Sequence, residues 1–138
     1  MESVLLSSIT IINSMQNPPA ELAGGNVHLI TTTKGWEEHL SEANKGGKTV
    51  IANFSTSWSG PCREIAPAYV ELANRYSSTT FLTVDIDALP EFSSSWDIKA
   101  TPTFFFLKDG RQVDKLVGSN KEKLWKKVGA IADSYHAK

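Results

Sequence analysis

The residues whose types could do chemistry lie together at positions 58 to 62, in the order Trp58-Ser59-Gly60-Pro61-Cys62. Cys62 is the only cysteine in the chain. A cysteine in the first turn of a helix feels the positive end of the helix dipole and free backbone N–H groups, and both favour the nucleophilic thiolate. If a helix begins here, these five residues indicate sulfur chemistry.

Ser59 occupies the position where two-step disulfide exchange needs a second sulfur. In a Cys-x-x-Cys turn the first thiolate attacks a substrate disulfide, and the second thiolate then resolves the mixed disulfide and releases the product. A serine hydroxyl is too weak an acid to replace the first thiolate, and the motif holds no histidine that could activate it. We therefore expect dithiol turnover to be absent or severely impaired.

Cys62 by itself leaves two interpretations open. It could be a buried and inert thiol, because free cysteine often packs as a small apolar side chain. It could also be a slow one-thiol exchanger, because the start of a helix still favours its anion. With one cysteine no intramolecular disulfide can form, which excludes the class of disulfide-stapled secreted domains and fits a reducing compartment.

The composition excludes several other functions. The 138 residues correspond to about one domain, and the net charge of −1 provides no broad basic field for nucleic acid or an anionic membrane. No apolar run reaches the roughly 20 residues that span a bilayer. His28, His39 and His136 do not match a metal-ligand spacing, so we predict no metal site and no cofactor.

The elements that must position the motif follow from apolar patterns. The segment 49–54, with almost no polar face, predicts a central strand covered on both sides. The motif follows it and opens a helix with Ile65, Tyr69 and Leu72 on one stripe, in which Pro67 predicts a kink. Other strands are predicted at 27–30, 81–86, 103–107 and 112–117, with helices around 34–45, 91–96 and 121–131.

Turn and cap signals delimit these elements. Asp109-Gly110 predicts a hairpin turn, and Ser119 with Glu122 predicts a capping box at the start of the last helix. Breaks at Pro18-Pro19 and Gly24-Gly25 indicate that residues 1–25 are an N-terminal arm and that 26–138 are the folded domain. The arm lacks the positive segment of a signal peptide. Helix-separated strands favour parallel pairing and the last hairpin is antiparallel, so we predict one mixed α/β sheet with helices on both faces.

From about residue 27 to 135 the chain resembles the thioredoxin family. The resemblance depends on an ordered set of residues: Trp58, Gly60-Pro61-Cys62, Pro67, Thr101-Pro102-Thr103 and Gly118. The segments 54–58 and 84–87 are similar to the h-type thioredoxins of plants, including members with N-terminal extensions. The resemblance implies the thioredoxin fold, a central mixed sheet of about five strands flanked by about four helices.

The resemblance also implies roles for individual residues. Position 59 would be the attacking site and Cys62 the resolving thiol. Pro102 would follow a cis peptide bond, although an ordinary proline at the start of a strand is the alternative. Trp58 could instead be a core aromatic. A shallow surface for docking substrates would be formed by Trp58, Gly60, Pro61, Ala100, Thr101, Pro102 and Gly118.

Two further positions depart from the family pattern. Asn53 stands where the family commonly has a buried aspartate that accepts a proton, and Thr83 stands where a lysine often pairs with that aspartate. Asparagine has no proton equilibrium near neutral pH, so this relay is absent. The two changes agree, because a buried charge pair is exchanged for neutral polar groups.

We therefore predict a monomeric cytoplasmic protein of the thioredoxin type. The parent activity would be reduction of protein disulfides, with electrons from a thioredoxin reductase or from glutathione and glutaredoxin, as the resemblance implies. Ser59 would silence that activity. Two alternatives are a redox-silent module that binds extended peptides and a glutathione-linked monothiol exchanger that uses Cys62.

Overall fold

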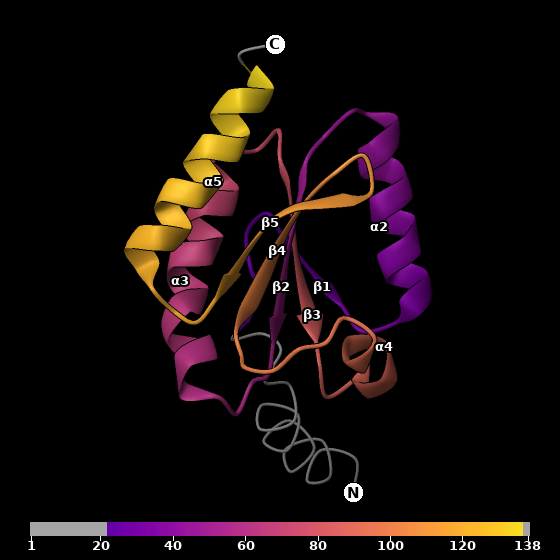
Figure 1. Ribbon diagram of the computed structural model, residues 1–138, viewed down its shortest axis with the longest axis vertical. Coiled ribbons are helices and arrows are strands. Elements are labelled where there is room, and N and C mark those ends of the chain that lie inside the picture. The colour runs from indigo at the N-terminus through magenta and orange to yellow at the C-terminus, as the bar shows by residue number, and fades with distance from the viewer. Residues whose placement is uncertain (1–21, 137–138) are drawn as a thin grey trace, which may run out of the picture.

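The computed structural model describes residues 22–136, and most of the predicted N-terminal arm lies outside them (Figure 1). Five strands form one sheet in the spatial order β1-β3-β2-β4-β5. Strands β1, β3 and β2 are parallel, whereas β4 and β5 run antiparallel to their neighbours. The strands are β1 (Val27–Ile30), β2 (Val50–Ser55), β3 (Thr80–Asp85), β4 (Thr103–Lys108) and β5 (Arg111–Val117). The predicted mixed sheet is confirmed.

Four helices of the described part cover the two faces of the sheet (Figure 1). They are α2 (Thr33–Lys45), α3 (Gly60–Arg75), α4 (Pro90–Ser94) and α5 (Lys121–His136). Helices α3 and α5 lie together on one face, and α2 and α4 lie on the other. Each face has its own apolar core, so β2 is buried along its whole length between them.

The ends of these elements follow local chemistry. Thr32 caps α2 by accepting the N–H of Gly35 at 3.0 Å, and the hairpin turn has positive φ angles at Asp109 and Gly110. The cap of α5 differs from the prediction. Asn120 accepts the N–H of Lys123 at 2.9 Å, so the N-cap is Asn120 and Ser119 lies outside the helix. Either side chain can cap a helix, and the pattern was placed one residue too early.

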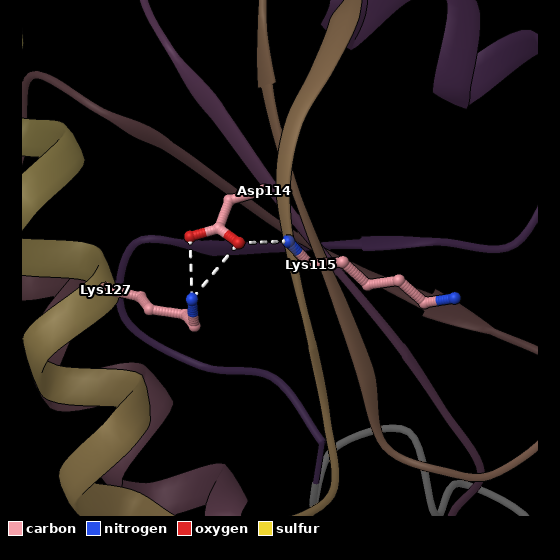
Figure 2. A network of polar contacts seen from close by, with 3 residues as sticks. All are labelled: Asp114, Lys115 and Lys127. Carbon is pink, nitrogen blue, oxygen red and sulfur yellow. Dashed lines mark hydrogen bonds and ion pairs between the residues drawn. The ribbon is translucent and has the colours of Figure 1, made fainter.

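An ion pair ties β5 to the helix that covers it. Figure 2 shows the Asp114 carboxylate between two donors, the Lys127 ammonium of α5 and the backbone N–H of Lys115. The two Nζ–O distances are 2.9 and 3.1 Å. The hydrogen bond from Lys127 holds the pKa of Asp114 below its ordinary value. The contact fixes the strand that leads to Gly118, which belongs to the predicted docking surface.

Tyr69 anchors α3 to the centre of the sheet. Its hydroxyl is fully buried and lies 2.9 Å from the carbonyl oxygen of Ile51 in β2 and 2.7 Å from that of Leu82 in β3. Burial raises the pKa of this hydroxyl well above its ordinary value, so it remains a neutral donor shared between the two carbonyls. The helix that begins at the motif is therefore fixed to both neighbouring strands.

We expect Tyr69→Phe to lower the free energy of unfolding by about 1–2 kcal/mol, because two buried carbonyl oxygens lose a donor. Guanidinium unfolding followed by circular dichroism measures the change. Tyr76→Phe is the matched control, since the Tyr76 hydroxyl makes no hydrogen bond to the described side chains and backbone of residues 22–132. Equal stability of the two variants would contradict the anchoring role of Tyr69.

Candidate functional site

The motif lies where β2 ends and α3 begins. Ser59 has an extended backbone and is the N-cap of α3, and its Oγ accepts the N–H of Cys62 at 3.4 Å. Serine is among the preferred N-cap residues because its oxygen satisfies one of the free N–H groups in the first turn. The side chain is 7% exposed. Ser59 is therefore built into the start of the helix.

Cys62 points into the protein. Its side chain is fully buried, and its sulfur accepts the backbone N–H of Thr56 at 3.4 Å. The bond closes the loop between β2 and α3 around the sulfur. This burial agrees with the first of the two interpretations of Cys62, a buried and inert thiol.

Trp58 lies on the outside of the same loop. It is 71% exposed, so it is not a core aromatic, and its Nε1 donates to Asp87 Oδ1 at 3.4 Å. Asp87 follows β3, whose end lies beside the end of β2. The contact orients the indole ring over the segment that leads from β3 to α4.

The second part of the candidate site precedes β4. The Thr101–Pro102 peptide bond is cis, and the carbonyl oxygen of Pro102 accepts the N–H of Gly118 at 2.8 Å. Gly118 has a φ of 102°, which only glycine adopts without strain. The backbone of Thr101 makes no hydrogen bond within the described residues. Its N–H and carbonyl groups are thus available to an extended partner chain.

The structure brings several of the predicted docking residues together. Trp58, Ala100 and Thr101 line one cavity of about 350 Å³. Pro102 and Gly118 are joined by their hydrogen bond, and Gly60 and Pro61 are exposed in the first turn of α3. Among the side chains that the structure describes, no group of three or more metal-binding residues occurs. Across residues 22–136, no helix has the length and apolar character to cross a membrane.

Behind the motif, Asn53 and Thr83 are register partners on β2 and β3, and both are fully buried. Asn53 Oδ1 accepts the Ser55 hydroxyl at 2.6 Å, while its Nδ2 has no partner among the described residues. The Thr83 hydroxyl donates to the carbonyl oxygen of Leu22 at 3.2 Å. Asn53 and Thr83 both depart from the family pattern, and they were predicted to compensate each other. They lie side by side on neighbouring strands, and neither carries a charge.

Sequence reasoning did not find three features of this site. The cap formed by Ser59 had a local signal, since a serine followed two residues later by a proline in the first turn marks a helix start. No local sequence signal predicted the hydrogen bond from Thr56 to Cys62 or the hydrogen bond from Trp58 to Asp87. The latter joins residues 29 positions apart, which no short pattern connects.

The geometry defines the class of protein first: an α/β protein with a thioredoxin fold and the candidate site at the start of α3. The thioredoxin family model matches residues 27–130. A thioredoxin H-type from Populus jackii is 63% identical over 117 residues, which cover 85% of this chain and 84% of the poplar protein. Thioredoxin H9 from Arabidopsis thaliana is 60% identical over 114 residues, which cover 83% of this chain and 81% of that protein.

A solved structure agrees with these relatives. The crystal structure of a poplar wild-type thioredoxin h has a TM-score of 0.77 and 62% identity, and the match covers 79% of this chain and 98% of that chain. The chain belongs to the thioredoxin family, and the relatives it matches here include plant h-type thioredoxins.

The environment of Asp85 predicts a pH dependence of stability. Burial raises the pKa of this carboxyl, although the N–H of Asp87 donates to it at 3.0 Å. At pH values below the ordinary aspartate value of about 3.9, the group is protonated in both states. As the pH rises through the folded pKa, the charged form becomes less favourable in the folded than in the unfolded state, and stability is lost.

Asp85→Asn therefore should leave the Tm unchanged near pH 3 and raise it by about 2–4 °C near pH 7. Thermal unfolding at several pH values measures the difference. Asp109→Asn, in the exposed hairpin turn, controls for the loss of one negative charge. A Tm difference that is largest at acidic pH would show that the predicted pH dependence has the wrong sign.

Proposed function

We propose that this chain is a thioredoxin-type protein that docks protein disulfides but lacks dithiol turnover because Ser59 stands at the attacking position. One observation carries the proposal. Ser59 Oγ occupies the helix start and accepts the N–H of Cys62, which is where an attacking thiolate would be stabilised. Membership of the thioredoxin family supports the parent activity, thiol–disulfide exchange on protein substrates.

With sulfur at position 59 the steps would balance as follows. The thiolate attacks one sulfur of a substrate disulfide, a mixed disulfide forms, and the other substrate sulfur leaves as a thiolate. Cys62 then attacks the sulfur at position 59 and releases the second substrate thiol. Asn53 cannot accept the proton of Cys62, so this proton would pass to solvent or to the leaving thiolate. The oxygen of Ser59 cannot begin this sequence.

Docking would use the surface that surrounds the motif. Its residues would be Trp58, Gly60, Pro61, Ala100, Thr101, Pro102 and Gly118, with the unpaired backbone groups of Thr101 accepting an extended segment of the partner. We infer a monomer of the cytoplasm with an arm at 1–25 and the domain at 26–138. A form with sulfur at position 59 would take electrons from thioredoxin reductase or from glutathione and glutaredoxin.

Reduction of insulin disulfides by dithiothreitol tests the proposal. We expect no acceleration by the chain as it stands and turnover by Ser59→Cys, at least about 100-fold above the unchanged chain, since only the variant holds two thiols one helical turn apart. The double variant Ser59→Cys/Cys62→Ser controls for single-thiol reactivity. If the Ser59→Cys form is also inactive, the scaffold is not that of a reductase.

The burial of Cys62 favours the redox-silent binding module among the alternatives. A glutathione-linked monothiol exchanger needs its sulfur in contact with the incoming disulfide, whereas Cys62 Sγ is covered and bonded to the N–H of Thr56. The two alternatives differ in the fate of a bound target. An exchanger leaves a mixed disulfide on Cys62, and a binding module does not.

We expect Cys62 in the folded chain to react with Ellman's reagent at least about 100-fold more slowly than in concentrated guanidinium chloride, since reaction requires local opening. Incubation with glutathione disulfide should add no glutathione by mass spectrometry. Ser41→Cys/Cys62→Ser places one thiol on the exposed face of α2 as a reactive control. Rapid glutathionylation of native Cys62 would favour the exchanger.

A further inference from the structure

Two histidine side chains meet where α2 lies against β1. His28 belongs to β1 and His39 belongs to α2. The centroids of their imidazole rings are 4.8 Å apart, and the ring planes are tilted by 40°. Neither ring lines the cavity beside Trp58. The pair therefore lies outside the candidate site at the start of α3.

His39 is held in a defined orientation. Its Nδ1 lies 2.9 Å from the carbonyl oxygen of Gly35, one turn earlier in α2. A carbonyl oxygen can only accept a hydrogen bond, so Nδ1 carries the hydrogen of the neutral ring and Nε2 is the atom that gains a proton in acid. The ring cannot turn away from His28 without losing this hydrogen bond.

The charged groups around the two rings differ. An open cavity of about 580 Å³ is lined by both histidines and by Glu42, Lys45, Lys48 and Thr80. Glu38 and Glu42 line a second cavity together with His39. Lys48, in the loop between α2 and β2, acts on His28 instead. A proton on His39 therefore has carboxylates as neighbours, whereas a proton on His28 meets cations.

These neighbours determine how the contact responds to pH. Burial of part of the ring lowers the pKa of His28, and the charges of His39 and Lys48 lower it further. Separation of α2 from β1 would expose the ring and remove His39, so the separated form binds a proton more readily. By linkage, the packed form is most stable above the ordinary histidine pKa of about 6.5 and loses stability as the pH falls below that value.

The two halves of α2 are held unequally. Near the start of the helix Trp36 is buried. Its ring contacts three other aromatic rings, those of Phe54, Phe92 and Trp96. Leu40 is partly covered, and the second half of α2 buries only the small side chain of Ala43. Repulsion between the two imidazole rings thus acts on the half of α2 that buries the smaller apolar area.

We propose that the contact between His28 and His39 is a pH-sensitive device that loosens the second half of α2 from β1 as the pH falls below neutrality. When both rings are protonated, two cations face each other across the observed contact, and Lys48 adds a third positive charge. The inference is independent of the proposed function, since no residue of the candidate site takes part.

Titration of the imidazole rings, followed by ring-nitrogen NMR on the full chain, tests the coupling between them. We expect His28 to titrate at a lower pH in the folded chain than in urea, and its midpoint to rise in the variant His39→Gln. Glu37→Gln, on the exposed face of α2, is the matched control and should leave the midpoint unchanged. An unchanged midpoint in His39→Gln would show that the rings titrate independently and would overturn the proposal.

Amide hydrogen exchange tests the loosening itself. Between about pH 7.5 and about pH 5.5 we expect the protection of residues 39–45, corrected for intrinsic exchange rates, to fall at least about 3-fold while that of α3 stays unchanged. His28→Gln should abolish the fall, because the second imidazolium cannot form. An equal fall in α2 and α3 would be a general effect of acid, and no fall in α2 would show that the contact stays closed. Either result would overturn the proposed device.

Discussion

The burial of β2 on both faces is the constraint on which the rest of the site depends. All six of its residues are buried, so the strand cannot shift without exposing one of two apolar cores. Helix α3 follows after four residues and is bonded back to β2 and β3 through Tyr69. The first turn of α3 is thereby held at one end of the sheet, whatever atom occupies position 59.

This constraint explains why the fold does not require a sulfur at position 59. The start of α3 requires an acceptor for its free N–H groups, and the Ser59 oxygen supplies one. A thiolate at position 59 would accept a hydrogen bond from the same N–H group, which favours the reactive anionic form of the sulfur. The oxygen of Ser59 thus supports the local structure, and under the proposed function the nucleophile is absent. The neutral pair of Asn53 and Thr83 behind the motif likewise fills a buried space without a charge that would need a partner.

Local patterns predicted most of the fold, whereas contacts between distant segments could not be predicted. The strand at β2, the helix after the motif and the Asp109-Gly110 turn each have a signal within a few residues, and all three are observed. The cap of α5 was misplaced because Ser119 and Asn120 both have capping side chains and differ only in their backbone setting. The cavity that joins Thr56 to Ser93 forms only when α4 packs beside the end of β2, and no spacing in the sequence encodes that contact.

Docking and exchange are physically separable in this architecture. The indole of Trp58 is oriented by Asp87, and Pro102 is bonded to Gly118, so neither contact involves the side chain of Ser59. The unpaired backbone of Thr101 and the cavity beside it are likewise independent of that oxygen. Under the proposed function, exchange would need a sulfur at position 59, whereas affinity for a partner would be set by the docking surface around it. With oxygen in place of sulfur at position 59, no mixed disulfide can form with a partner. The lifetime of the bound partner should therefore depend only on hydrogen bonds and apolar contacts.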